Sequence, residues 1–373
     1  RIRLWIADVT AGSPAAVHLD AIEGLVPFDM RLTGLRLSDR DGAWLFADHV
    51  SLAWSPHALL GGRLQVDEIA VGTIDLARLP AAEKTQAPEP SGPLIPQLPI
   101  AIDLQRLSVE RLALAAPILG EPAALSVEAS AKLGEIGDDL SASLSLQQLS
   151  GHTGTATIDL AYRPDQDFLS LTGTVAEPQG GVLGRLLGLP RGSNLQIALD
   201  GDGPLAAWQG RMNATLGGNA LLDLTAQIQG HEARTVAFAL RAAPDAVLPE
   251  QFRPLFAGGI DANGTFEIAP GGGTIDVSGF SARSAAGALG VSGSLGLSEP
   301  GDLAVTVALG DFRPFAALVP DVTWSGATMQ LRLQDEINTP RLTADVGVQN
   351  LAAADMRIGT SKLTLHASAA QGL

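Results

Sequence analysis

The stretch that decides the fold runs from Leu64 to Leu76 and reads LQVDEIAVGTIDL. Its apolar residues recur at alternating gaps of two and three, and the same six spacings return thirty-eight residues later in Ile102–Leu114, IDLQRLSVERLAL. A gap of two is the period of a β-strand, and a gap of three keeps all six side chains on one face only where the strand bulges. The two stretches therefore predict an internal repeat built from curved strands.

A proline-rich segment separates the two copies, with six prolines between Pro80 and Pro99. Proline donates no hydrogen bond to a β-ladder, so we expect an exposed linker over residues 81–99. This linker divides the chain into an amino-terminal β segment with the repeat, residues 1–80, and a long continuation of β-structure, residues 100–373.

Beyond the linker, apolar residues alternate with polar ones over many short stretches, which is the period of half-buried strands. Turn sequences such as DGDG at residues 200–203 separate them without helical crossovers, so sequential antiparallel pairing is favoured. The composition, with 42 Gly and 23 Pro against 5 Trp, 1 Tyr and 10 Phe, excludes a helical bundle. The expected fold class is all-β: an elongated, curved, repetitive antiparallel sheet, a β-groove or taco-like solenoid, with a few short helices capping or plugging it.

A second repeat interrupts the strands. FRPLFA at residues 252–257 returns as FRPFAA at residues 312–317, and GRLLGL at residues 184–189 is a looser copy. We expect short helical inserts near residues 181–189, 249–257 and 311–319. They either plug an end or edge of the sheet or serve as ordinary connectors, and the sequence favours neither.

Several functions are excluded by what the chain lacks. The net charge of −16 and only three lysines argue against a nucleic-acid partner. Cysteine is absent, and the six histidines are scattered without metal-ligand spacing. Neither a phosphate loop nor a serine nucleophile motif occurs. We therefore expect no enzyme, no catalytic residue, no metal and no cofactor.

Short motifs near the start of the chain occur in a particular order. They are IEG at residues 22–24, LRLSD at 35–39, GAWL at 42–45, LAWSP at 52–56 and LLGGRL at 59–64, with GDGPL at 201–205 and Trp208 as a later landmark. In this order they resemble the TamB proteins, the translocation and assembly module subunits of the AsmA-like family of bacterial envelope proteins. The resemblance covers most of the chain, and its first eighty residues are the most specific.

The resemblance implies a location in the periplasm and an anchor in the inner membrane upstream of Arg1. It also implies an outer-membrane barrel partner, TamA, which docks through a region outside this chain. The implied function is bridge-like lipid transfer between the inner and outer membranes through a hydrophobic β-groove, in support of outer-membrane biogenesis. The alternative is an assembly scaffold that helps to insert outer-membrane β-barrel proteins or autotransporters. The family marks no catalytic residues.

Two arrangements can hide the apolar side of such strands. The sheet either folds on itself as a filled β-helix or curves into a groove whose lining accepts phospholipid acyl chains. In the groove interpretation, the expected lining residues are apolar and occupy alternate positions of the predicted strands. They are Leu104, Val109, Leu144, Leu146, Ile158, Leu160, Leu171, Ile197, Leu199, Leu224, Phe238, Leu240, Phe266, Ile268, Val305, Val307, Leu331, Leu333, Val346 and Val348.

Overall fold

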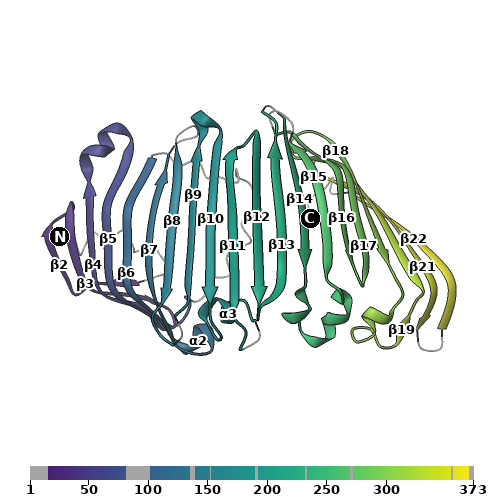
Figure 1. Ribbon diagram of the computed structural model, residues 1–373, viewed down its shortest axis with the longest axis horizontal. Helices are drawn as coiled ribbons and strands as arrows, with labels where there is room; N and C mark the ends of the chain where they lie inside the picture. Colours follow the sequence, from purple (N-terminus) through teal and green to yellow (C-terminus); the bar gives the residue numbers. More distant parts are fainter. Residues whose placement is uncertain are drawn as a thin grey trace. The chain divides into compact units, whose positions relative to one another are not determined.

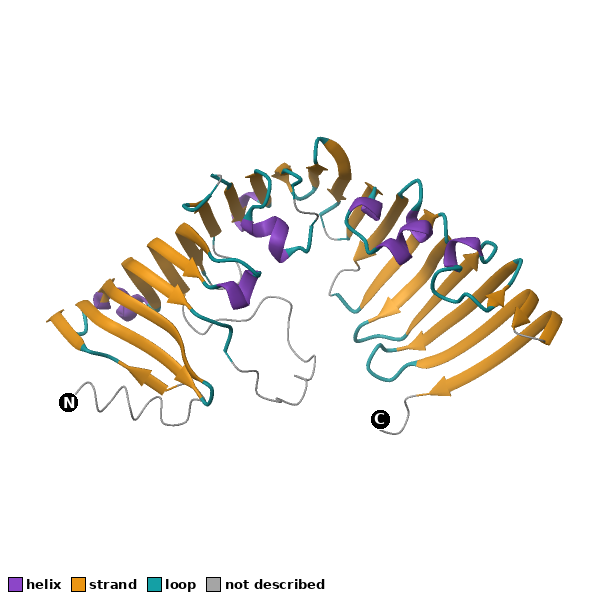
Figure 2. Ribbon diagram, turned by 90° about the horizontal axis from the view of Figure 1, so that it is seen from below, coloured by secondary structure: helices purple, strands orange, loops and turns teal. Residues whose placement is uncertain are grey.

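A computed structural model describes residues 16–80, 101–134, 139–151, 153–189, 192–231, 233–268, 272–353 and 356–368. The expected linker, residues 81–99, lies outside these residues. The chain forms two compact units, residues 1–197 and 198–373, and each is described by itself. In both units an open, curved and mainly antiparallel sheet dominates, with short helices at the ends of strands, which confirms the all-β fold class (Figures 1 and 2).

The first unit contains ten strands and four short helical segments among its described residues. The strands are β1 (Ala16–His18), β2 (Ala21–Leu25), β3 (Asp29–Asp39), β4 (Gly42–Ser55), β5 (Arg63–Leu76), β6 (Ala101–Leu114), β7 (Ala123–Leu133), β8 (Leu140–Gln148), β9 (Thr155–Arg163) and β10 (Phe168–Glu177). The helical segments are η1 (Pro56–Gly61), α2 (Ala116–Leu119), η2 (Pro164–Gln166) and α3 (Val182–Leu186). Strand β11 (Leu195–Pro204) spans the boundary between the units and contains residues 200–203, DGDG, so this stretch is part of a strand and not the turn that the sequence predicted.

The second unit also consists of β-strands with short helical segments between some of them. Its strands are β12 (Ala207–Leu216), β13 (Asn219–Gln229), β14 (Arg234–Ala242), β15 (Ile260–Ile268), β16 (Thr274–Ser284), β17 (Gly287–Gly296), β18 (Gly301–Leu309), β19 (Val322–Thr323), β20 (Gly326–Asp335), β21 (Arg341–Ala353) and β22 (Met356–Ser368). Its helical segments are η3 (Pro244–Ala246), η4 (Glu250–Phe256) and η5 (Arg313–Phe315). Each strand from β12 to β17 pairs antiparallel with the next, and the order continues β18–β20–β21–β22.

The repeat found in the sequence becomes a pair of neighbouring strands. β5 and β6 lie side by side, and each of the six apolar residues of one copy is paired with its counterpart in the other, from Leu64 with Ile102 to Leu76 with Leu114. The pairing is parallel, whereas the sequence favoured antiparallel neighbours throughout, so this one connection departs from the prediction. A parallel pair needs a crossover of a dozen or more residues, which residues 77–100 supply.

Bulges occur where the sequence has gaps of three. Between β6 and β7 the register shifts between Leu104 and Leu107 and again between Val109 and Leu112. Each shift inserts an extra residue on one strand, so the next apolar side chain returns to the same face. The strands bend as a result, as the spacing predicts.

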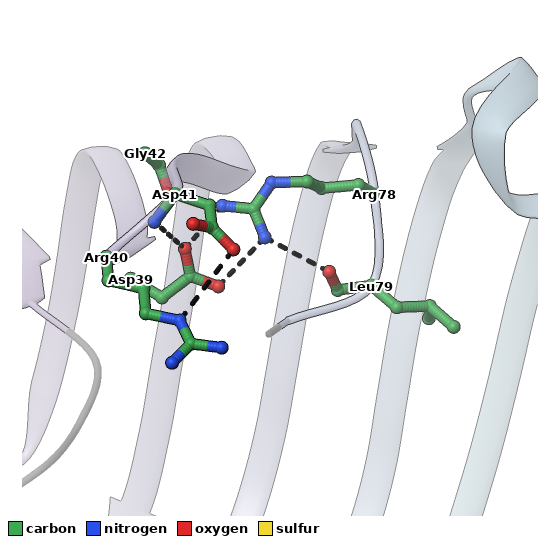
Figure 3. Close-up of polar contacts among 6 residues, drawn as sticks. All are labelled: Asp39, Arg40, Asp41, Gly42, Arg78 and Leu79. Atoms are coloured by element: carbon green, nitrogen blue, oxygen red, sulfur yellow. Dashed lines mark hydrogen bonds and ion pairs between the residues drawn. The ribbon is translucent and has the colours of Figure 1, made fainter. Parts of the chain in front are cut away.

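An ion pair fixes one end of this region (Figure 3). Arg78, just after β5, donates from Nη1 to Asp39 Oδ2 at 2.8 Å and from Nη2 to the carbonyl oxygen of Gly42 at 2.8 Å. The hydrogen bond to Asp39 raises the pKa of Arg78. Because Asp39 and Gly42 form the β3–β4 turn, the contact ties that turn to the end of β5.

The parallel register can be tested with cysteines, since the chain has none of its own. Ala70 and Ser108 are paired across β5 and β6. We expect the double variant Ala70→Cys, Ser108→Cys to form a disulfide on mild oxidation, because paired Cα atoms lie within the usual range of about 4.4–6.8 Å. The variant Ala70→Cys, Arg111→Cys moves one partner by about 10 Å along the strand and should stay reduced. Equal disulfide yields, measured by thiol titration, would contradict this register.

Candidate functional site

In the first unit, the strand pairing gathers apolar side chains on one face of the sheet. Residues paired across a ladder project to the same face, so the register of the ladders identifies that face strand by strand. One unbroken row crosses β3 to β10 and consists of Leu32, Val50, Val71, Val109, Val127, Leu146, Ala156 and Val175. Its neighbour contains Leu52, Ile69, Leu107, Ala129, Leu144 and Ile158. We call this side of each unit's sheet its apolar face.

The second unit repeats the arrangement. A row from β12 to β22 consists of Met212, Leu224, Leu240, Ala262, Ala282, Leu289, Val307, Met329, Val346 and Leu363. Beside this row the face carries three aromatic rings: Phe238 stacks on Phe266 with centroids 5.8 Å apart and is tilted against Phe280 at 6.1 Å. Gly264 lies between them, and a Cβ there would come within 2.8 Å of Phe238.

The apolar face is only partly covered. Among the described residues no large side chain is completely buried. On the apolar face Leu144 is 37%, Ile158 42% and Leu160 38% exposed, although strands flank all three residues on both sides. No second layer therefore packs on these positions within the described residues. The filled β-helix considered from the sequence is not what these residues form.

The opposite face holds the polar and charged groups. Ser130 and Ser143 share a hydrogen bond of 2.7 Å between β7 and β8, and Arg332 Nε donates to Asp302 Oδ1 at 2.7 Å between β20 and β18. The hydrogen bond from Arg332 lowers the pKa of Asp302, so this carboxylate stays ionised. These two pairs place polar and charged side chains on the opposite face.

Short helices close one rim of the first unit's apolar face. Leu119 of α2 and Val182 of α3 are buried against Leu114 and Ala123, at the ends of β6 and β7. A cavity of about 100 Å³ beside α3 has a mainly apolar lining. These helices therefore cover one end of the strands. α3 lies in the predicted insert near residues 181–189, and α2 was not predicted from the sequence.

A buried carboxylate holds α3 in place. Glu177, at the end of β10, is 6% exposed. Its Oε1 accepts the backbone N–H of Leu183 at 2.6 Å, and its Oε2 accepts that of Gly184 at 2.6 Å. Both are first-turn amides that have no partner within the helix, so the carboxylate caps it.

The helical inserts of the second unit are also where the repeat FRP places them. η4 includes residues 252–256 of one copy and η5 includes residues 313–315 of the other, and each is followed by a strand. Phe312 and Phe315 contact Trp324 with ring centroids 6.5 and 5.3 Å apart, and Trp324 Nε1 donates to the carbonyl oxygen of Gly310 at 2.9 Å. The aromatic residues anchor this insert beside β20.

All twenty residues predicted to line a groove lie on strands. Strand pairing places eighteen of them on the apolar face, seven in the first unit and eleven in the second. The other two, Ile197 and Leu199 of β11, are assigned to it by alternation alone. Val109 is buried, while Leu144, Ile158, Leu160 and Ile268 are exposed and the others are half-buried. Their role in holding lipid stays a prediction.

The sequence prediction missed part of the apolar face. Strands β7, β12, β16 and β17 contribute Val127, Met212, Val277, Phe280 and Leu289, none of which was proposed. In these strands Ala or Gly occupies several inward positions, such as Ala129 and Gly293, so their alternation is weak. The flanking turns were the signal that could have identified them.

No family model, curated protein or solved structure matches this chain. Within the described ranges, no three His, Cys, Asp or Glu side chains gather as a metal site. The helices of the described segments are all too short or too polar to cross a membrane. The apolar face is therefore the candidate site, and its chemistry rests on its own residues.

The cap on α3 predicts a loss of stability. Replacing Glu177 with Ala removes both acceptors, so we expect the free energy of unfolding to fall by about 1–2 kcal/mol, as for other lost caps. The matched control is Glu121→Ala, since Glu121 is exposed and meets Arg185 at 3.3 Å. That change should cost about 0.5 kcal/mol or less. Urea unfolding measures both, and similar losses would argue against the cap.

Proposed function

We propose that the apolar face carries phospholipid acyl chains and that the protein passes lipid across the periplasm between the inner and outer membranes. The observation that supports this most is the uncovered apolar face in each unit. The periplasmic location, the inner-membrane anchor and the barrel partner TamA, implied by the resemblance to TamB, belong to the same proposal. No catalytic residue or cofactor is needed for it.

The chemistry of the face suits hydrocarbon better than a polar ligand. Its side chains are mainly Leu, Ile, Val and Ala, and the ladder hydrogen bonds use the backbone donors and acceptors between them. Two acyl chains of about 14 methylenes each would cost on the order of 20 kcal/mol to expose to water, at roughly 0.8 kcal/mol per methylene. An apolar surface that extends over many strands reduces this cost at each position along it.

The cavities support a moving ligand rather than a trapped one. Small-molecule sites typically enclose about 300–1,000 Å³. The apolar cavity beside α3 holds only about 100 Å³. The larger cavities contain charged groups, one of about 390 Å³ beside Arg211 on β12 and β13 and one of about 410 Å³ beside Asp75 and Arg111 at the ends of β5 and β6. The apolar face is thus an open surface, on which a chain can shift from strand to strand.

One observation favours the alternative function, an assembly scaffold. β22 pairs with β21 alone among the described strands, and Met356, Leu363 and Leu365 on it are 62%, 56% and 52% exposed. An open strand edge with apolar side chains can accept an added strand from another protein. A scaffold would bind such strands through backbone hydrogen bonds, whereas a lipid carrier binds through the apolar face.

Lipid analysis separates these functions. We expect gently purified protein to contain phospholipid, detected by mass spectrometry of an organic extract, and to bind a fluorescent fatty acid in solution. A peptide with the alternating sequence of an outer-membrane strand should not displace the fatty acid. Protein free of lipid that binds the peptide instead would favour the scaffold.

Neighbouring residues on opposite faces provide a matched pair of variants. Leu160 is on the apolar face, between Ala142 and Leu171, whereas Ala161 is on the polar face between Ser141 and Ser170. We expect Leu160→Glu to weaken fatty-acid binding roughly tenfold, since it replaces a hydrocarbon contact with a carboxylate. Ala161→Glu adds the same charge beside two serines and should leave binding within a factor of about two. Equal loss in both variants, with unchanged circular dichroism, would contradict binding on the apolar face.

A further inference from the structure

Two neighbouring turns at one rim of the first unit expose apolar side chains to solvent. The β2–β3 turn exposes Leu25 at 73% and Phe28 at 42%, and η1, between β4 and β5, exposes Leu59 at 44% and Leu60 at 94%. We call these four residues the apolar tip. Isolated exposed leucines are common on proteins, but four on adjacent turns form a patch.

Trp54 joins the two turns. Its backbone N–H donates to the carbonyl oxygen of Phe28 at 3.0 Å, and its indole Nε1 donates to that of Pro27 at 2.6 Å. The rings of Phe28 and Trp54 are also in contact, with centroids 6.1 Å apart. η1 begins two residues after Trp54, so the tryptophan fixes both turns at the same rim.

The apolar tip continues the apolar face. Trp54 is paired with Val66 in the ladder, and Val66 with Leu104, so this row of the face reaches the rim where the tip lies. The first apolar residues of the two parallel strands, Leu64 and Ile102, are at the same rim. Hydrocarbon that entered here would meet the apolar face directly.

Charge is absent from both turns. Residues 24–28 read GLVPF and residues 56–62 read PHALLGG, without a single Asp, Glu, Lys or Arg, in a chain that is 17% charged. Glu23, Asp29 and Arg63 flank them. Apolar turns bordered by charged residues match the division of a bilayer between hydrocarbon and headgroups.

Backbone hydrogen bonds within both turns also suit an apolar environment. Phe28 N–H donates to the carbonyl oxygen of Leu25 at 2.7 Å, and Gly62 N–H donates to that of Leu59 at 3.0 Å. Internal hydrogen bonds lower the cost of removing these turns from water. Gly62 adopts a left-handed conformation, φ 71°, which closes η1 tightly.

The size of the patch argues against a protein as its occupant. A stable protein interface covers about 800 Å² on each partner. Even a whole aromatic side chain contributes only about 150–250 Å², so four partly exposed side chains fall short of that area. A bilayer requires no complementary shape, and a few protruding side chains are enough to enter it.

We propose that the apolar tip inserts into the interfacial region of a lipid bilayer. This goes beyond the proposed function, because a protein can attach to a membrane at the tip whether or not its apolar face carries lipid. With a net charge of −16 and uncharged turns, attachment depends on hydrocarbon contact rather than on attraction to anionic lipid.

Vesicle flotation tests the proposal with residues 1–373 and phosphatidylcholine vesicles. We expect binding to persist in about 1 M salt, where the Debye length is about 3 Å. Leu60→Asp should weaken binding roughly tenfold or more, since one leucine in hydrocarbon provides about that factor. The matched control is Leu187→Asp, because Leu187 is 63% exposed and follows α3 at the other rim of the unit. It should bind as the parent does.

A single label gives a second, independent reading. Because the chain has no cysteine, Leu60→Cys and Leu187→Cys each accept one environment-sensitive fluorophore. We expect a blue shift on adding vesicles at position 60 and none at position 187. A fluorescent fatty acid, bound without vesicles, reports the apolar face separately and should be unaffected by Leu60→Asp.

Three results would overturn the proposal. The first is vesicle binding that Leu60→Asp leaves unchanged, or that Leu187→Asp weakens equally. The second is a label at position 60 that does not respond to vesicles. The third is a blue shift that appears without vesicles and grows with protein concentration, which would make the tip a contact between copies of the chain. Loss of fatty-acid binding alone would contradict the proposed function and not the tip.

Discussion

The register of the β-ladders is the constraint on which both units depend. Side chains alternate between the two faces of a strand, so a slip of one residue would move every apolar side chain to the polar face. With no second layer over the described strands, each apolar side chain is sheltered mainly by its neighbours in the adjacent strands. Val71 is 7% exposed between Val50 and Val109, whereas Leu363, with a neighbour on one side only, is 56% exposed.

The alternating gaps of two and three between apolar residues made the curved strands and the repeat predictable, because this spacing shows which side chains share a face. The spacing does not predict whether two neighbouring strands are parallel or antiparallel. A row such as Val71 and Val109 is equally apolar in a parallel or an antiparallel pair, so the side chains contain no information on the parallel pairing of β5 and β6. The length of the intervening segment does contain it, since a two-residue hairpin cannot join parallel strands and a long crossover can.

The candidate site was predictable where its residues are large. Leu144 and Ile158 alternate with serine, threonine and aspartate, and were proposed. β16 and β17 were missed because glycine occupies positions of the apolar face, as Gly293 does opposite Val277, and because a bulge separates Val277 from Phe280. Gly264 shows what such glycines do: without a Cβ, it leaves room for the rings of its neighbours. Small residues therefore shape the face, although a count of hydrophobic residues overlooks them.

The partial exposure of the apolar face determines how a bound chain would behave. Each side chain there is already sheltered by its row, so an acyl chain removes only the remaining exposed area at any one position. The gain at each position is limited to the exposed area that remains, which is larger at Leu144 and Ile158 than at Val109. A chain that moves along the face therefore exchanges many small contacts rather than a few large ones. The face is least uniform at Phe238, Phe266 and Phe280, where rings replace aliphatic side chains. If lipid moves along this surface, its contacts change most at the aromatic cluster. Substitutions there would have the largest effect on the rate of movement.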